Sequence, residues 1–180
     1  MRYYSRKTII LQIESLNNSN LELGRDDGIM KTCFVASSGG HWEELMCLNE
    51  ITVENETFYV TEEGGQASDS NIKNIYLLPQ INRHESGFVW HFIKLIFITN
   101  KILKKEKPKL VVTTGALIAF PFCVFAKLRR AKVIYIESFA RVNNASLTGK
   151  LTYYLADLFL VQWESLLKFY PKAKYVGGIF

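Results

Sequence analysis

The sequence has few of the residues that mark a disulfide-rich or metal-binding protein. Its 180 residues include only three cysteines, Cys33, Cys47 and Cys123, with no C-x-x-C spacing. Scattered thiols in odd number are typical of a reducing cytosol and exclude a disulfide framework. The chain also has only three histidines, and no group of histidines and cysteines has the spacing of metal ligands. We therefore expect no metal site.

Long apolar segments and complete phosphate-binding motifs are also missing. The first segment is basic, but its apolar run Ile9–Leu11 is too short for a secretory signal. No stretch of the chain predicts a convincing membrane-spanning helix. The pair Gly39–Gly40 belongs neither to a full G-x-G-x-x-G motif nor to a Walker A loop, since no Lys-Ser/Thr pair follows it. Internal repeats and low-complexity tracts are absent as well.

The chain does have enough apolar material for one globular domain. Hydrophobic residues make up 48% of its 180 residues, which suits a single domain or a domain with a tail. Residues 1–29 turn polar in their second half, so we expect a poorly ordered extension or a wrongly assigned start, with Met30 as the initiator. Residues 30–180 then form the domain. The net charge of +5 indicates an anionic partner: a membrane surface, a nucleic acid or a phosphorylated substrate.

From Lys31 onward, short apolar runs alternate with helical patterns. The expected strands are Thr32–Ala36, Thr57–Thr61, Asn74–Leu78, Leu110–Thr113, Lys132–Ile136, Leu158–Val161 and Lys174–Val176. The expected helices are Trp42–Asn49, Phe88–Lys105, Ala119–Leu128, Leu147–Ala156 and Glu164–Phe169. Apolar runs of this length between helices predict a parallel sheet buried on both faces. The fold class is therefore α/β, a Rossmann-like doubly wound sheet whose ligands lie beyond the carboxyl ends of the strands.

The most informative segment is the strand, glycine turn and helix between Thr32 and Leu48. In such a βα unit the glycines let the backbone approach a ligand, and the free N–H groups at the helix start suit a phosphate or pyrophosphate. His41 lies where the helix begins, so we expect its imidazole on the ligand side. The alternative is a tight turn with a serine cap, because the motif is incomplete.

A second feature is the helix predicted over Phe88–Lys105, which has two apolar faces. One face is needed to cover the sheet, and the second, with Trp90 and Phe97, is surplus. Lysines lie close to it, which suits a helix at an anionic membrane interface. An unusually well-buried helix and a subunit contact are the alternatives. The residues expected to contact the membrane are Phe88, Trp90, Phe97, Lys101, Lys104 and Lys105.

A third feature follows the strand predicted over Lys132–Ile136. Glu137 falls at the carboxyl end of that strand, where a carboxylate can accept hydrogen bonds from sugar hydroxyls or act as a general base. Arg141 is placed to pair with a phosphate. A helix cap with exposed charges is the alternative interpretation.

Three short motifs, in this order, resemble the N-terminal half of a GT-B glycosyltransferase: Ala36–His41, Val112–Gly115 and Ile134–Ser138. The chain is similar to the acceptor-binding half of the lipid I N-acetylglucosaminyltransferase of peptidoglycan synthesis. It most closely resembles the asparagine-linked-glycosylation protein fourteen family and its bacterial capsule and exopolysaccharide relatives. The resemblance covers Met30–Phe180.

The resemblance implies an accessory, acceptor-binding subunit of a two-component glycosyltransferase. A separate thirteen-type partner, the C-terminal GT-B half, is expected to bind the UDP-sugar donor, so the chain alone is expected to be inactive and to need no cofactor or metal of its own. The expected acceptor is a polyprenyl-pyrophosphate-linked sugar. The expected location is the cytoplasmic face of an anionic membrane, with peripheral attachment and no nucleic-acid partner.

This interpretation assigns two catalytic residues, His41 as the base at the acceptor hydroxyl and Glu137 as an orienting or assisting group. Residues expected to bind the acceptor and its pyrophosphate are Ser38, Gly39, Gly40, Thr114, Gly115, Ser138, Arg141, Asn143 and Asn144. Two alternatives stay open. The chain is either a non-catalytic tether that recruits the catalytic subunit to the membrane, or an autonomous nucleotide-binding protein of flavodoxin-like fold.

Overall fold

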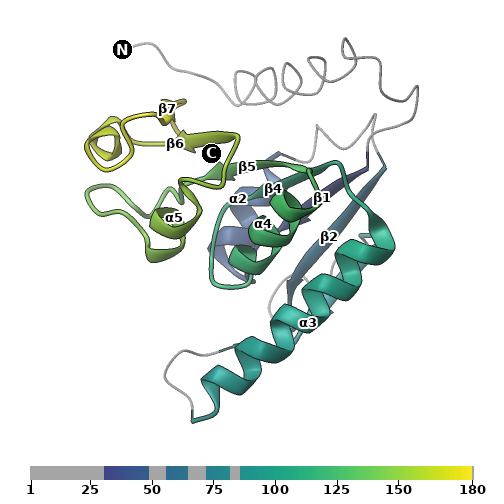
Figure 1. Cartoon of the computed structure of the whole chain (residues 1–180). Coiled ribbons are helices and arrows are strands. Elements are labelled where there is room, and N and C mark those ends of the chain that lie inside the picture. The colour runs from purple at the N-terminus through teal and green to yellow at the C-terminus, as the bar shows by residue number, and fades with distance from the viewer. Residues whose placement is uncertain (1–30, 49–55, 65–71, 82–85, 180) are drawn as a thin grey trace, which may run out of the picture.

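The computed structural model describes residues 31–48, 56–64, 72–81 and 86–179, and its framework is a seven-stranded sheet (Figure 1). All neighbouring strands are parallel, in the order β3-β2-β1-β4-β5-β6-β7. The order changes direction at β1, which pairs with both β2 and β4. The strands are β1 (Thr32–Val35), β2 (Thr57–Glu62), β3 (Ile75–Leu78), β4 (Leu110–Thr113), β5 (Lys132–Ile136), β6 (Leu158–Val161) and β7 (Lys174–Tyr175).

Helices cover both faces of this sheet, as expected for a doubly wound domain. In Figure 1, α2 and α4 lie on opposite faces, and α4 contacts both α3 and α5. The helices are α2 (Gly40–Met46), α3 (Phe88–Glu106), α4 (Ala119–Leu128), α5 (Leu147–Thr152) and the 3₁₀ helix η3 (Glu164–Lys168). The α/β Rossmann-like prediction is confirmed.

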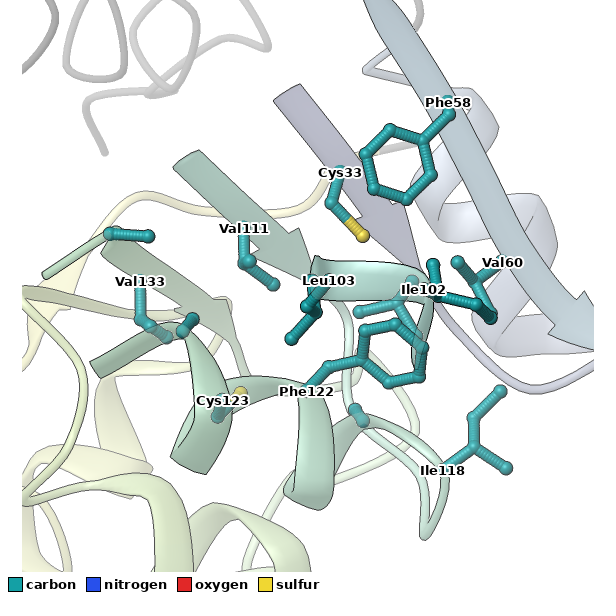
Figure 2. Close-up of a cluster of buried hydrophobic side chains, with 14 of the residues drawn as sticks. Cys33, Phe58, Val60, Ile102, Leu103, Val111, Ile118, Phe122, Cys123 and Val133 are labelled. Carbon is teal, nitrogen blue, oxygen red and sulfur yellow. The ribbon is translucent and has the colours of Figure 1, made fainter. Parts of the chain in front are cut away.

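The core follows from the two-residue period of the strands. On one face, Cys33 and Val35 pack with side chains of α3 and α4, as Figure 2 shows for the labelled residues. On the other face, Phe34 and Ala36 pack with Trp42 and Leu45 of α2. Each large apolar side chain buried in this way contributes roughly 1.5–3 kcal/mol to folding. Cys33 and Cys123 lie in this core as free thiols.

Three helix predictions need correction. The helix predicted over Leu147–Ala156 ends at Thr152, because the chain then tightens into a turn in which the Leu155 N–H donates to the Thr152 carbonyl. The segment predicted as the helix Glu164–Phe169 is a 3₁₀ helix that ends at Lys168. The helix predicted to begin at Trp42 begins at Gly40.

Some predictions fall outside the described residues, namely the extension at 1–29 and the end of the predicted helix at Asn49. Within the described part of the chain, no helix is both long and apolar enough to cross a bilayer. Among the same residues, no cluster of histidine, cysteine, aspartate and glutamate is arranged to hold a metal ion.

Candidate functional site

The loops that follow β1 and β4 are joined by His41 and Thr114, which are 73 residues apart in sequence. His41 Nδ1 lies 2.9 Å from the carbonyl oxygen of Thr114, and the Thr114 hydroxyl donates to the carbonyl oxygen of His41 over 2.7 Å. The Thr114 side chain is fully buried, whereas His41 is half-buried. The glycine turn and the β4 loop therefore form one unit at the carboxyl edge of the sheet.

The contact with Thr114 also fixes the proton on the imidazole. A carbonyl oxygen can only accept, so Nδ1 carries the hydrogen, and Nε2 of the neutral ring is left as the acceptor. Burial lowers the pKa of His41, and this effect outweighs the hydrogen bond to Thr114 and the nearby charge of Glu137, which raise it. Near neutral pH the ring is therefore a neutral base with one free nitrogen.

The two glycines before His41 meet different requirements. Gly39 has φ 82° and ψ −143°, a conformation that is essentially restricted to glycine. Gly40 has no such constraint, and a Cβ atom at either position would meet no protein atom within 4 Å. Both residues are exposed. The fold therefore does not require glycine at position 40. The missing side chain leaves the backbone there accessible to a ligand.

A buried carboxylate that the sequence did not reveal lies beside this turn. Glu62, the last residue of β2, is 6% exposed, and backbone N–H groups of Ser38 and Ile81 hydrogen-bond its carboxylate. Burial raises the pKa of Glu62 despite these donors. The strand predicted over Thr57–Thr61 stops one residue short of Glu62, whereas in the structure β2 includes Glu62, which pairs with Leu78 of β3.

The second predicted catalytic residue, Glu137, is placed differently from His41. It is 1% exposed, and its Oε2 accepts hydrogen bonds from the N–H and hydroxyl of Ser146 and from the Tyr170 hydroxyl, the last over 2.6 Å. Ser146 is the N-cap of α5. The carboxylate thus holds the start of α5 to the sheet and has no oxygen free of protein donors, because the Ser138 N–H donates to Oε1.

A second buried network begins at Glu44, one turn after His41 in α2. Oε1 of Glu44 accepts from the Ser138 hydroxyl and the Phe139 N–H, and Oε2 accepts from Gln162 Nε2. Gln162 in turn accepts from the Ile179 N–H. Sequence reasoning missed Glu44 because it stands beside the exposed Glu43 on an amphipathic helix. This network ties α2 to the β5 loop and to the C-terminal part of the domain.

The residues predicted to bind the acceptor fall into two groups. The side chains of Thr114 and Ser138 are buried and engaged within the protein, and Gly115 is buried with no space for a Cβ, which would lie 2.7 Å from the Tyr135 hydroxyl. The residues that stay exposed or half-exposed are Ser38, Gly39, Gly40, Arg141, Asn143 and Asn144. The first group shapes the loops, and the second is accessible to a ligand.

The surplus apolar face of α3 is confirmed as an exposed surface. Val89, Trp90, Ile93 and Phe97 are 68%, 60%, 37% and 70% exposed, and Lys94 lies over the Trp90 ring. In Figure 1 the N-terminal end of α3 lies beyond the end of β2, on the side of the carboxyl edge. We call these four residues the α3 apolar face.

The lysines predicted beside this face do not all behave alike. Lys101 and Lys104 are exposed one and two turns beyond Phe97. Lys105 instead turns back to donate to the Tyr76 hydroxyl and to pair with Glu106. Phe88 is half-buried and stacks on Phe92. Of the residues predicted to contact a membrane, Trp90, Phe97, Lys101, Lys104 and Lys105 are thus exposed and Phe88 is half-buried.

Comparison with known proteins matches most of the described chain to one family. A family model described as "Oligosaccharide biosynthesis protein Alg14 like" matches residues 32–179. A UDP-N-acetylglucosamine transferase subunit ALG14 of Rattus norvegicus is 29% identical over 174 residues, which cover 81% of each chain. The subunit of the same name from Yarrowia lipolytica is 40% identical over 83 residues, covering 43% of this chain and 38% of the relative.

Solved structures with low sequence identity show the fold. The chain superposes on MurG of Acinetobacter baumannii with a TM-score of 0.66 and 18% identity, covering 83% of this chain and 45% of that one. A UDP-N-acetylglucosamine 2-epimerase of Rickettsia bellii gives a TM-score of 0.65 with 14% identity and 46% coverage of its chain. The chain thus spans about half the length of these structures, and its fold is one Rossmann-like half of a GT-B architecture.

Proposed function

The chain belongs to the Alg14-like family of oligosaccharide biosynthesis proteins, and we propose on this basis that it is the acceptor-binding subunit of a two-part UDP-N-acetylglucosamine transferase. The observation that carries this proposal is the match to a relative named as a transferase subunit, of which the chain covers 81%. The fold of the chain corresponds to one half of MurG. In this proposal a second protein supplies the other GT-B half and binds the UDP-sugar. The acceptor is a polyprenyl-pyrophosphate-linked saccharide of the lipid-linked, capsular or exopolysaccharide type.

In this proposal His41 is the catalytic base. Its Nε2 takes the proton from the acceptor hydroxyl as that oxygen attacks the anomeric carbon of the sugar, and UDP departs on the partner's side. Thr114 acts on this step through His41, since it fixes the proton on Nδ1 and the orientation of the ring. Glu137 is a positioning residue that holds the start of α5.

The exposed part of the site suits the charged part of the acceptor. Gly39 and Gly40 leave open backbone next to His41, and Arg141 is exposed close enough to His41 for its charge to lower the pKa of the imidazole. A guanidinium and open backbone N–H groups are suitable partners of a pyrophosphate. Asn143 and Asn144 supply exposed amides for sugar hydroxyls.

The α3 apolar face, together with Lys94, Lys101 and Lys104, provides peripheral attachment to an anionic membrane. When α3 lies on the membrane, the carboxyl edge of the sheet, with His41, is on the same side of the domain as the membrane that holds the acceptor. Replacing Trp90 and Phe97 with serine is expected to release the protein from anionic vesicles. Phe169→Ser, at an exposed residue away from α3, is the matched control. Unchanged sedimentation of the Trp90/Phe97 variant would remove the membrane from this proposal.

The decisive test of the two-part enzyme is an assay with UDP-N-acetylglucosamine and a lipid-linked acceptor. We expect no transfer by the purified chain alone and transfer once a C-terminal GT-B half subunit is added. Turnover by the isolated chain would instead support the autonomous enzyme. Full activity of the pair after His41→Ala would support the tether, in which this chain only recruits the catalytic subunit.

A further inference from the structure

The exposed apolar side chains of the molecule gather on one of its two helical layers. Of the eleven large hydrophobic residues that are exposed in the described chain, seven belong to α3, α4 and α5, and Tyr154 lies two residues after the end of α5. These three helices lie side by side, since α4 contacts both of the others. The layer formed by α3, α4 and α5 is thus apolar beyond what α3 alone contributes.

Helix α5 carries its own outward stripe. Thr148, Gly149 and Thr152 are its buried residues, and they face the domain. Its exposed positions are Leu147, Lys150 and Leu151, and Tyr154 is exposed in the turn that follows; the three apolar residues are 56%, 49% and 88% exposed. We call Leu147, Leu151 and Tyr154 the α5 apolar face. It is separated from the α3 apolar face by the width of α4.

Cationic residues outnumber acidic ones in this layer. Between residues 88 and 157 the sequence contains twelve lysines and arginines but only three acidic residues, Glu106, Glu137 and Asp157. Asp157 is paired with Lys127 and Lys132. Glu137 is buried, and Glu106 is paired with Lys31 and Lys105 and accepts from Tyr76. The exposed charged residue on α5 itself is the cation Lys150.

We propose that the α5 apolar face is a second membrane contact, which lies on the same anionic bilayer as the α3 apolar face. This inference rests on the membrane attachment proposed for α3. The two apolar faces can insert into the surface of a bilayer, and the lysines around them attract its anionic lipids. Each carboxylate of this layer is buried or paired, so none repels the lipids. Tyr154 has the amphipathic ring that favours the membrane–water interface. Two contacts also fix orientation, because a single helix leaves the domain free to rotate about its axis.

The test uses the full chain and vesicles of phosphatidylglycerol and phosphatidylcholine at low salt. We expect Leu147→Ser/Leu151→Ser to lower the vesicle partition coefficient by about tenfold or more, since two exposed leucines lose their apolar contact. Leu77→Ser and Phe169→Ser are matched controls, because both residues are exposed to a similar degree outside this layer. They are expected to bind vesicles as the wild type does.

A second measurement reports contact directly. An environment-sensitive dye on Tyr154→Cys, in a Cys47→Ser background, is expected to shift to the blue when anionic vesicles are added, whereas the same dye on Phe169→Cys is not. If the α3 variant is released while the α5 variant binds normally and its dye stays unshifted, the second contact is wrong and the membrane proposal survives. Normal vesicle binding combined with loss of the catalytic partner would make the α5 apolar face a protein interface and overturn the inference.

Discussion

His41 and Thr114 hold each other by two reciprocal hydrogen bonds, the imidazole Nδ1–H to the Thr114 carbonyl and the Thr114 hydroxyl to the His41 carbonyl. Each residue therefore uses one side-chain and one main-chain group. The pair joins the glycine turn after β1 to the loop after β4, the two strands that flank the point where strand order reverses. Ligands of doubly wound sheets bind at such a point.

The first prediction concerns the base. In the reconstituted two-subunit enzyme, we expect His41→Ala to lower kcat by roughly 10²–10⁴, the usual contribution of general acid–base help. His41→Asn is expected to be nearly as damaging, since an amide can hydrogen-bond but cannot take the proton. Steady-state kinetics measure both variants. A change confined to KM would mean that His41 only positions the acceptor.

The pH profile of kcat tests the same assignment. Only the neutral imidazole can accept a proton, so activity is lost as the pH falls through the pKa of His41. Because burial lowers that pKa, the acid limb of the profile is expected below the ordinary value of 6.5. Thr114→Val removes the hydroxyl that bonds the His41 main chain and is expected to lower kcat without abolishing it. An acid limb above 6.5 would contradict this assignment.

The second prediction separates the two turn glycines. Gly40→Ala is expected to leave the unfolding free energy unchanged or slightly raised, because its Cβ has open space and alanine favours the helix. If the acceptor pyrophosphate approaches this backbone, KM for the acceptor rises. Gly39→Ala instead forces alanine into a backbone conformation with φ 82°, at a cost of about 1–3 kcal/mol.

Urea denaturation and acceptor kinetics distinguish these outcomes for the two variants. An unchanged KM in Gly40→Ala, with normal stability, would mean that the ligand does not touch the turn. The serine-capped turn would then be the whole explanation of the motif.

The third prediction concerns Glu137, whose carboxylate is enclosed by protein donors. In Glu137→Gln, the new amide NH₂ group replaces one of the two carboxylate oxygens, each of which now accepts hydrogen bonds from a protein hydroxyl or N–H group. A donor then faces a donor, so we expect a loss of about 1–3 kcal/mol of stability. Gly149→Ala is expected to be worse, since its Cβ would collide with the same carboxylate. Thermal melting checks both. A Glu137→Gln protein with normal stability but no activity would return Glu137 to the catalytic site.

The sequence was sufficient for the strands and most helices because apolar runs and helical periodicity are local properties. It also placed His41 correctly at the start of a helix and Glu137 directly after a strand. It could not tell that Glu137 is enclosed, since Ser146 and Tyr170 reach it from 9 and 33 residues away. Glu44 was missed because its three donors come from two segments about a hundred residues downstream. Contacts between residues so far apart in the sequence produce no periodic pattern that a single sequence could reveal.

The last prediction concerns Glu44, which anchors α2 three residues after His41. Glu44→Gln presents an N–H₂ group to donors on Ser138, Phe139 or Gln162. Gln162 cannot turn its amide to compensate, because its oxygen accepts from Ile179 and its nitrogen also donates to the Glu137 carbonyl. We expect a loss of about 1–3 kcal/mol in unfolding free energy, measured by urea denaturation, together with a lower kcat as α2 and His41 shift. Glu43→Gln, at the exposed neighbour, is the matched control and is expected to be neutral.

The effect of Glu44 on stability also depends on pH. Burial raises the pKa of Glu44 in the folded state above the ordinary 4.5. At a pH between 4.5 and this raised pKa, the folded protein binds a proton more readily than the unfolded chain. The contribution of this group to stability therefore falls as the pH rises from 4.5 through the raised pKa. Glutamine does not titrate, so the stability gap between wild type and Glu44→Gln is expected to narrow over that range. A gap that widens toward neutral pH would show that the hydrogen bonds to the carboxylate outweigh its burial.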